Sequence, residues 1–304
     1  MSSPLEPEVV CDALAAAGSS LSVDQVTIEL REERALARLP QGLLIWFATS
    51  DAGQSRLARE RRVLRLLEER CSFAAPRVLH EDPAGRFDLR QSVAGECDSR
   101  GVYERAKADL AFSARLGAAI GAILADQHSA ISAKDCADWL PRQVAWPEQS
   151  SWIVERLPRV TGDGELLTRA NEALERYDAV SAATAEDDRV LVHGDVGFHN
   201  LAFDPATLTV RGIFDYDAAT WADPHHDFRY LLFHNDRTDL LEAALAIYEP
   251  NTQRTLSRER ITLYNAVCAL SYLAYRDGKP ADERSCGRTL SEDLAWTRHA
   301  LASL

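Results

Sequence analysis

"LVHGDVGFHN", residues 191–200, lies between two apolar runs and places a carboxylate at Asp195 and a carboxamide at Asn200, five positions later. The flanking runs VLVH, NLAFD and VRGIFDY are typical of short strands, and DPATLT is typical of a hairpin turn. Such a hairpin returns Asp215, near the end of the last run, to the neighbourhood of Asn200. A pair of Asx turns in an ordinary loop is the competing interpretation of the first two residues.

Three oxygen-bearing side chains in one place suit the transfer of a phosphoryl group. That reaction needs an acceptor hydroxyl aimed in line, a carboxylate that takes its proton, and a divalent metal that holds the phosphates. Because Mg²⁺ prefers hard oxygen ligands, an asparagine and a further aspartate can complete a metal site beside the base. The pattern therefore predicts one base and two metal ligands on two adjacent loops.

The composition is that of a globular protein of 304 residues, 46% hydrophobic and 27% charged. The formal net charge of -13 argues against nucleic-acid and membrane partners and mildly favours a cationic ligand. The six cysteines form no CxxC pair, so we expect reduced thiols and a cytoplasmic protein. No run is long enough to span a bilayer, and the acidic N-terminus resembles neither a signal nor a transit peptide.

Two parts of different character divide the chain. In the first, a helix (5–17), three β-prone runs (23–32, 34–42, 43–50), an amphipathic helix (54–70) and a further strand (86–93) follow one another. In the second, we expect one long apolar helix over 104–129 and helices near 165–180, 226–234, 238–248, 257–276 and 288–302. We therefore predict an α+β fold with a small β-rich lobe (1–94), a larger, mostly helical lobe (95–304) and a ligand cleft between them.

The motif around Asp195 resembles a known family. His193 and Gly194 precede Asp195, and Asn200 and Asp215 follow it with the spacing of H-R-D-x₄-N and D-F-G in protein kinases. Together with ERRVLRLLEER (60–70), LRQSVAG (89–95) and DPHHD (223–227), the motif resembles the aminoglycoside phosphotransferase and choline kinase family. These are small-molecule relatives of protein kinases, and the resemblance, from about residue 23 to about residue 280, implies their bilobal fold.

The resemblance also implies a role for each residue of the motif. Asp195 would be the catalytic base, and Asn200 and Asp215 would bind Mg²⁺. His193 would support the loop by packing and hydrogen bonding, and Asp227 would brace it. A metal site among the neighbouring histidines is disfavoured, because adjacent residues of a helix do not face one another.

On the nucleotide side, the resemblance implies that the backbone of Gln91, Ser92 and Val93 meets the base of ATP or GTP. Glu60 would be the helix glutamate that pairs with a lysine on a strand and thereby orients the phosphates. That lysine is missing, because the run LLIWFATS contains no basic residue, and Trp46 or Phe47 occupies its place. A glycine-rich phosphate loop is missing as well.

Two hypotheses follow from these departures. An arginine from elsewhere could meet the phosphates, with Arg38, Arg59 and Arg62 as candidates, or the chain could be a pseudokinase that binds a nucleotide or another ligand in a regulatory role. The retained base and metal ligands favour an active enzyme.

We therefore predict a nucleoside-triphosphate-dependent O-phosphotransferase that acts on a hydroxyl of a small, cationic molecule. Aminoglycosides and basic peptide antibiotics rank first, which would make it an antibiotic-resistance enzyme, and choline-like, amino-alcohol or sugar acceptors follow. Acidic residues on the C-terminal side, Asp217 and Asp236 among them, could line an acceptor pocket, although solvated helix faces carry most such residues. Homodimerisation is left open.

Overall fold

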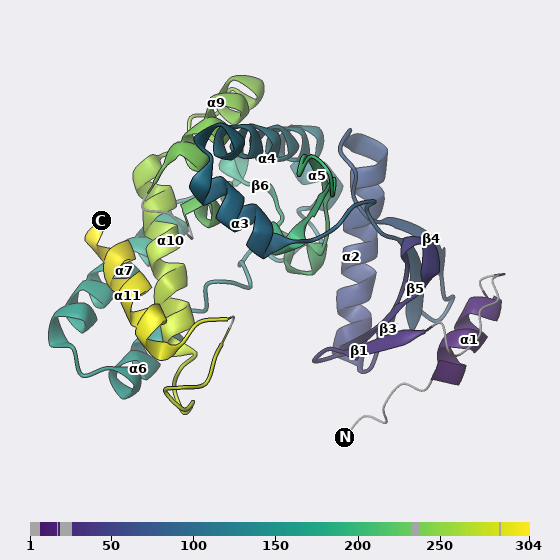
Figure 1. Ribbon diagram of the computed structural model, residues 1–304, viewed down its shortest axis with the longest axis horizontal. Coiled ribbons are helices and arrows are strands. Elements are labelled where there is room, and N and C mark those ends of the chain that lie inside the picture. Colours follow the sequence, from purple (N-terminus) through teal and green to yellow (C-terminus); the bar gives the residue numbers. More distant parts are fainter. Residues whose placement is uncertain (1–6, 17, 19–25, 233–236, 286) are drawn as a thin grey trace.

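The computed structural model describes residues 7–16, 18, 26–232, 237–285 and 287–304. A five-stranded sheet with helix α1 beside it forms one end of the molecule, α2 lies next to the sheet, and the remaining helices form the other end (Figure 1). The strands lie in the order β1-β2-β3-β5-β4, and all neighbours are antiparallel. Their bounds are β1 Thr27–Leu30, β2 Arg34–Arg38, β3 Leu43–Ala48, β4 Arg77–Glu81 and β5 Phe87–Gln91.

The central strands of this sheet have one apolar and one polar face, because successive side chains of a strand point to opposite sides. On the apolar face, the buried side chains of β2, β3 and β5 pack with Val10 and Leu14 of α1 (Pro7–Ala16): these are Ala35, Ala37, Ile45, Phe47, Phe87 and Leu89. The intervening residues line a cavity: Arg34, Leu36, Arg38, Leu44, Trp46 and Arg90. The sheet therefore presents arginines and a tryptophan to that cavity.

Helix α2 (Asp51–Arg70) connects the two ends of the molecule. It begins after Ser50, whose side chain accepts a hydrogen bond from the backbone N–H of Gly53. Val63, Leu64 and Leu67 are buried in the main hydrophobic cluster, which continues into the helical end. The helix is thereby fixed between the sheet and the helical part, with Glu60 buried on it.

The helical end consists mainly of long helices packed on one another (Figure 1). Their bounds are α3 Ser99–Ala108, α4 Leu110–Ala130, α5 Ala133–Cys136, α6 Ser150–Val160, α7 Gly164–Ala182, α8 His225–Phe228, α9 Asp239–Thr252, α10 Arg258–Ala274 and α11 Leu290–Ala302. The single helix predicted over 104–129 is wrong: the chain breaks at Asp109, whose side chain accepts a hydrogen bond from the N–H of Phe112 and caps α4.

Helices α4 and α9 are in unusually close contact. A Cβ atom placed on Gly117 would lie 2.3 Å from the carbonyl oxygen of Leu240, and one on Gly121 would lie 2.2 Å from that of Ala244. Because real Cβ atoms do not approach so closely, only glycine permits this distance between the helix axes. The apolar, Ala- and Gly-rich sequence of α4 is thus explained by burial on several sides.

Two short antiparallel strand pairs flank the loop that contains Asp195 and Asn200. β6 (Val190–Val192) pairs with β9 (Thr220–Ala222), and β7 (Leu201–Phe203) pairs with β8 (Val210–Ile213), both antiparallel. The predicted β7–β8 hairpin is confirmed. The sequence did not reveal β4, β9, α5 or α6, because β4 lies at the sheet edge without a regular apolar face and α6 contains Pro158.

The predicted arrangement of a β-rich N-terminal part and a helical C-terminal part is confirmed. The last strand of the sheet ends at Gln91 and the first helix of the second part begins at Ser99, so the predicted boundary at 94/95 falls in the connection. In the described part of the chain, we find no helix that combines the length and the apolarity required to cross a membrane.

Candidate active site

The loop after β6 is shaped by Gly194. This residue has φ = +86°, a backbone conformation that side chains rarely tolerate, and a Cβ atom on it would lie 2.8 Å from the carbonyl oxygen of Ala218. Glycine therefore allows the chain to turn sharply between His193 and Asp195 while passing close to the loop that follows β8.

Asp227, in α8, holds this turn by hydrogen bonds to its backbone. Its carboxylate, which is fully buried, accepts hydrogen bonds from the N–H groups of His193 (2.9 Å) and Gly194 (2.8 Å) and contacts Nε2 of His128 (3.1 Å). The guanidinium of Arg229 donates to the carbonyl of Gly194 (2.8 Å). Three backbone groups of the turn, the N–H groups of His193 and Gly194 and the carbonyl of Gly194, are thus paired with side chains from the helical part, which fixes the conformation of the loop.

His193 connects the turn to the end of β8. The backbone N–H of Asp195 donates to its Nδ1 (3.2 Å), so the ring proton is on Nε2, which donates to the carbonyl of Phe214 (2.9 Å). His193 and Asp227 therefore both lie where loop support was predicted. The ring of His193 also packs on Tyr216, with 4.4 Å between the ring centroids.

Asp195 projects from this turn toward Asn200. The amide nitrogen of Asn200 donates both to the backbone carbonyl and to Oδ2 of Asp195, each at 2.9 Å. Nε2 of His199, which the sequence assigned no role, lies 3.1 Å from the same Oδ2. Burial alone would raise the pKa of Asp195, but the hydrogen bonds and the nearby histidine charges lower it to about 2, so the carboxylate is ionised at neutral pH.

Asp215 joins this group from the end of β8. The N–H of Phe214 donates to the carbonyl of Asn200 (3.0 Å), so the two loops are directly bonded to each other. Asp215 itself adopts the left-handed conformation (φ 69°, ψ 64°), which aspartate tolerates better than most residues, and both it and Asn200 line one cavity of about 490 Å³. The structure therefore brings Asp195, Asn200 and Asp215 together.

The donor set fits Mg²⁺. Since the amide nitrogen of Asn200 faces Asp195, its oxygen is left for a cation, and Asp215 adds a carboxylate in the same cavity. Within the described ranges, no group of three or more His, Cys, Asp or Glu side chains could hold a metal ion by itself. This suits Mg²⁺ at a phosphate site, because it commonly takes one or two protein ligands and fills its remaining positions with water and phosphate oxygens.

Apolar side chains form part of the cavity wall. Leu36, Leu44, Val93, Ala202 and Phe214 line it, and its volume is in the range of small-molecule sites.

Of the predicted base-binding residues, Ser92 and Val93 line this cavity. The side chain of Gln91 instead donates to the carbonyls of Gln41 (3.0 Å) and Gly42 (3.2 Å), and the N–H of Ser92 donates to Gly42 (2.9 Å). A base-binding role for these residues stays a prediction, in which Val93 has the most direct access.

Arginines from two strands hold Glu60 at the polar wall of the cavity. Oε2 of Glu60 lies 2.9 Å from Arg90 of β5 and 3.3 Å from Arg34 of β2. The sequence analysis did not find these arginines, although the two-residue alternation of the strands could have placed both on the face of Trp46. Among its candidates, Arg38 lines the cavity, whereas Arg62 stacks on Trp139 at 3.9 Å.

Of the residues predicted for the acceptor, Asp217 lies at the junction of the two parts. Its carboxylate lies 2.9 Å from Arg34 and accepts two hydrogen bonds from Arg56 of α2, of which the one from Nε is 3.1 Å long. Asp217 is therefore already paired with two cations. Asp236 lies outside the described residues.

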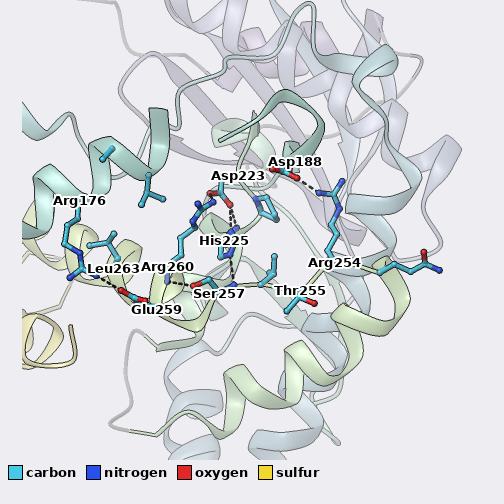
Figure 2. Close-up of a pocket in the computed structure, with 15 residues that line it drawn as sticks. Arg176, Asp188, Asp223, His225, Arg254, Thr255, Ser257, Glu259, Arg260 and Leu263 are labelled. Carbon is cyan, nitrogen blue, oxygen red and sulfur yellow. Dashed lines mark hydrogen bonds and ion pairs between the residues drawn. The ribbon is translucent and has the colours of Figure 1, made fainter. Parts of the chain in front are cut away.

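A second, larger cavity of about 740 Å³ lies on another side of the helical part, near the start of α10. Figure 2 shows its charged residues paired with one another: Arg176 with Glu259, and Arg260 and His225 with Asp223. Because it contains none of the three convergent residues, we take the smaller cavity as the candidate active site.

Comparisons with known proteins give the family and the fold. The sequence model of the phosphotransferase enzyme family matches residues 18–259, whereas a search of curated protein sequences finds no match. Among solved structures, the GDP complex of aminoglycoside 2'-phosphotransferase-IIIa has a TM-score of 0.66 at 18% identity, over 91% of this chain and 93% of that one.

Two further structures are similar. Macrolide 2'-phosphotransferase MphH from Brachybacterium faecium has a TM-score of 0.64 at 16% identity over 98% of both chains. The streptomycin–ATP complex of APH(2'')-IIa has a TM-score of 0.60 at 16% identity, over 92% of this chain and 91% of that one. The predicted protein-kinase-like bilobal fold is confirmed.

Proposed function

Because the chain belongs to the phosphotransferase enzyme family and is a small-molecule phosphotransferase, we propose that it transfers the γ-phosphate of ATP or GTP to a hydroxyl of a small, cationic acceptor. Aminoglycosides and basic peptide antibiotics rank first as acceptors, and choline-like molecules, amino alcohols and sugars follow. The nucleotide would occupy the cavity at the junction of an N-terminal lobe (1–94) and a C-terminal lobe (95–304).

The observation that carries this proposal is that Asn200 and Asp215 line one cavity and that Asp195 is hydrogen-bonded to Asn200 beside it. An ionised carboxylate lies 2.9 Å from an amide whose oxygen is left for a cation, and a second carboxylate lines the same space. An ordinary loop has no structural need for such an arrangement. Similar structures also favour a nucleotide and a small acceptor: one contains GDP, and another contains ATP with streptomycin.

In the proposed reaction, Asp195 accepts the proton of the acceptor hydroxyl. The hydroxyl oxygen bonds to the γ-phosphorus, the bond from that phosphorus to the bridging oxygen breaks, and the nucleoside diphosphate leaves. Asn200 and Asp215 would hold Mg²⁺, which neutralises phosphate charge when bound. The hydrogen bond from His199 helps to keep Asp195 ionised, and the bonds from His199 and Asn200 fix its direction, so it acts by orientation as well as by accepting the proton.

The acceptor class is supported by charge alone. A chain with a formal net charge of -13 attracts cations, so a polyamine-like molecule is drawn to it more readily than an acidic one.

A two-stage experiment tests the proposal. Thermal-shift titration with Mg·ATP and Mg·GTP comes first, and at least one should raise the melting temperature. Transfer of labelled γ-phosphate to a panel of hydroxylated amines, aminoglycosides, basic peptides and neutral sugars comes second.

Asp195→Asn should abolish transfer in the second stage while it still binds nucleotide. Asp138→Asn, an exposed substitution of the same type, should retain both transfer and nucleotide binding. Stabilisation by nucleotide without transfer to any acceptor would favour the nucleotide-binding pseudokinase. Equal turnover in Asp195→Asn would refute its role as the base.

A further inference from the structure

The polar face of the sheet carries a cation cluster at the place where β3 has none. On β3, Leu44 and Trp46 face the cavity, and Trp46 pairs with Leu36 of β2 and with Asp88 of β5. The guanidinium carbon of Arg34 lies 4.7 Å from the centroid of the Trp46 ring, and that of Arg90 lies 5.8 Å from it. Both arginines therefore lie within cation–π distance of the same tryptophan ring.

Arg90 is used mainly inside the protein. Its Nε and one terminal nitrogen donate to the carboxylate of Asp88 (2.6 and 3.0 Å), and its other terminal nitrogen lies 2.9 Å from Glu60. The side chain is 2% exposed. Burial would lower the pKa of Arg90, but Glu60 and Asp88 raise it, so the group is permanently charged. Its main effect is to hold Glu60 in place.

Arg34 is placed differently. One terminal nitrogen lies 3.3 Å from Glu60 and the other 2.9 Å from Asp217, two residues beyond Asp215. Each terminal nitrogen of a guanidinium carries a second N–H, so these two contacts leave donors for a further anion. Asp217 also keeps Arg56 as a partner if Arg34 turns toward that anion.

We propose that Arg34 is the phosphate-binding cation of this enzyme, that Glu60 and Arg90 position it, and that Trp46 fixes the plane of its guanidinium. The proposal rests on the proposed nucleotide-dependent function and names the residue that meets the phosphates. Arg34 lines the same cavity as Asn200 and Asp215, so a phosphate that coordinates a Mg²⁺ held by these two residues would share that cavity with Arg34. A planar guanidinium suits this place, because it stacks on an aromatic ring and binds phosphate oxygens in pairs.

The tryptophan explains why the cation comes from a neighbouring strand. The side chain of Trp46 occupies the place on β3 where a cation would be expected. A cation that meets the phosphates therefore has to come from one of the strands next to β3. Arg38, the other arginine of β2 on this face, is half-exposed and pairs with Glu29 at 2.6 Å, without contact to Glu60. Arg34, and not Arg38, is thus held by Glu60 beside the candidate metal ligands.

The test compares binding of a triphosphate with binding of its nucleoside. Isothermal titration with Mg·ATP and Mg·GTP, and with adenosine and guanosine, is carried out on the unaltered protein, Arg34→Gln, Arg38→Gln and Arg77→Gln. Arg77 is an exposed arginine of β4 that pairs with Glu68, so its variant controls for the loss of one charge. Arg34→Gln should weaken triphosphate binding about tenfold or more, since hydrogen bonds between charged groups are the stronger ones, and leave nucleoside binding unchanged.

Several outcomes would overturn the proposal. These are unchanged triphosphate affinity in Arg34→Gln, an equal loss for triphosphate and nucleoside, or a larger loss in Arg38→Gln. If Arg34→Gln does not fold, Arg34→Lys replaces it and should weaken only triphosphate binding, by about threefold or more, because an ammonium cannot span two anions. A lysine variant with unchanged affinity would equally overturn it. Failure of the unaltered protein to bind any nucleotide would instead refute the proposed function itself.

Discussion

Asp227→Asn tests whether the catalytic turn depends on one buried carboxylate. The native carboxylate receives the N–H groups of His193 and Gly194 and contacts His128, all within 3.1 Å. An asparagine has one acceptor oxygen, so it can keep the bonds on one side only. Its NH₂ group must then face an N–H group, donor against donor.

The size of the effect follows from these contacts. One buried N–H loses its acceptor, and the other two bonds change from charged to neutral, so the free energy of unfolding should fall by about 3 kcal/mol. For a chain of this length, that corresponds to a fall of roughly 5 °C in the melting temperature. Because the turn aims Asp195, phosphotransfer should also fall by about tenfold or more.

The stability difference should depend on pH in a definite direction. Burial would raise the pKa of Asp227, but the bond from His128, the nearby histidine charges and the N–H of Gly194 lower it below the usual value. A carboxyl with a lowered pKa stabilises the fold above its unfolded pKa, and this contribution is lost as the pH falls through the folded value. The difference in the free energy of unfolding between the unaltered protein and Asp227→Asn should thus be constant from about pH 5 to 8 and shrink below about pH 4.

The assay is urea unfolding followed by tryptophan fluorescence, at several pH values, with Asp138→Asn as the exposed control. A free energy of unfolding within about 0.5 kcal/mol of the unaltered protein at pH 7 would refute the reasoning, because that is the size of an ordinary surface effect. Full turnover in a variant of reduced stability would also refute it, since the catalytic turn would then keep its active conformation without the Asp227 carboxylate.

Three further results are expected. Removal of divalent cations with EDTA should abolish phosphotransfer and excess Mg²⁺ should restore it; activity that persists in EDTA would count against the metal site. Gly121→Ala should lower the melting temperature, because its Cβ would meet a carbonyl oxygen of α9 at 2.2 Å, whereas Gly162→Ala, with open space around it, should not; equal melting curves would contradict the close packing. Arg276→Leu should cost about 2–3 kcal/mol of stability in denaturant unfolding, because Asp293 would lose one buried charged hydrogen bond while it keeps Arg288 as a partner. Arg298→Leu, at the surface, should cost about 1 kcal/mol or less, and similar losses in both variants would argue against this distinction.

Local patterns predicted the parts of the fold whose signals are local. The apolar strands around Asp195 and the hairpin that returns Asp215 were readable because the motif and its turn lie in one continuous segment. The amphipathic helix α2 was readable from its regular leucines. The break at Asp109 was not, because a single capping residue in a long apolar helix changes the periodicity very little.

The cations of the site were harder to predict. Arg34 and Arg90 belong to strands separated along the chain. Alternation within each strand can indicate which face of the sheet they are on, but the antiparallel register is what places them beside Trp46. The sequence analysis found no basic residue in the run that forms β3, and its candidates were Arg38 on the preceding strand and Arg59 and Arg62 on the following helix. Long-range pairing decides such a site, and a single sequence does not display it.

The ion pairs of Asp217 have a consequence for protein engineering. This carboxylate belongs to the segment after β8, but its partners Arg34 and Arg56 belong to β2 and α2. In a chimera that joins the first 94 residues of another family member to the rest of this chain, Asp217 would lose its counterions wherever that member lacks the two arginines. Recombination libraries should therefore exchange all three positions together.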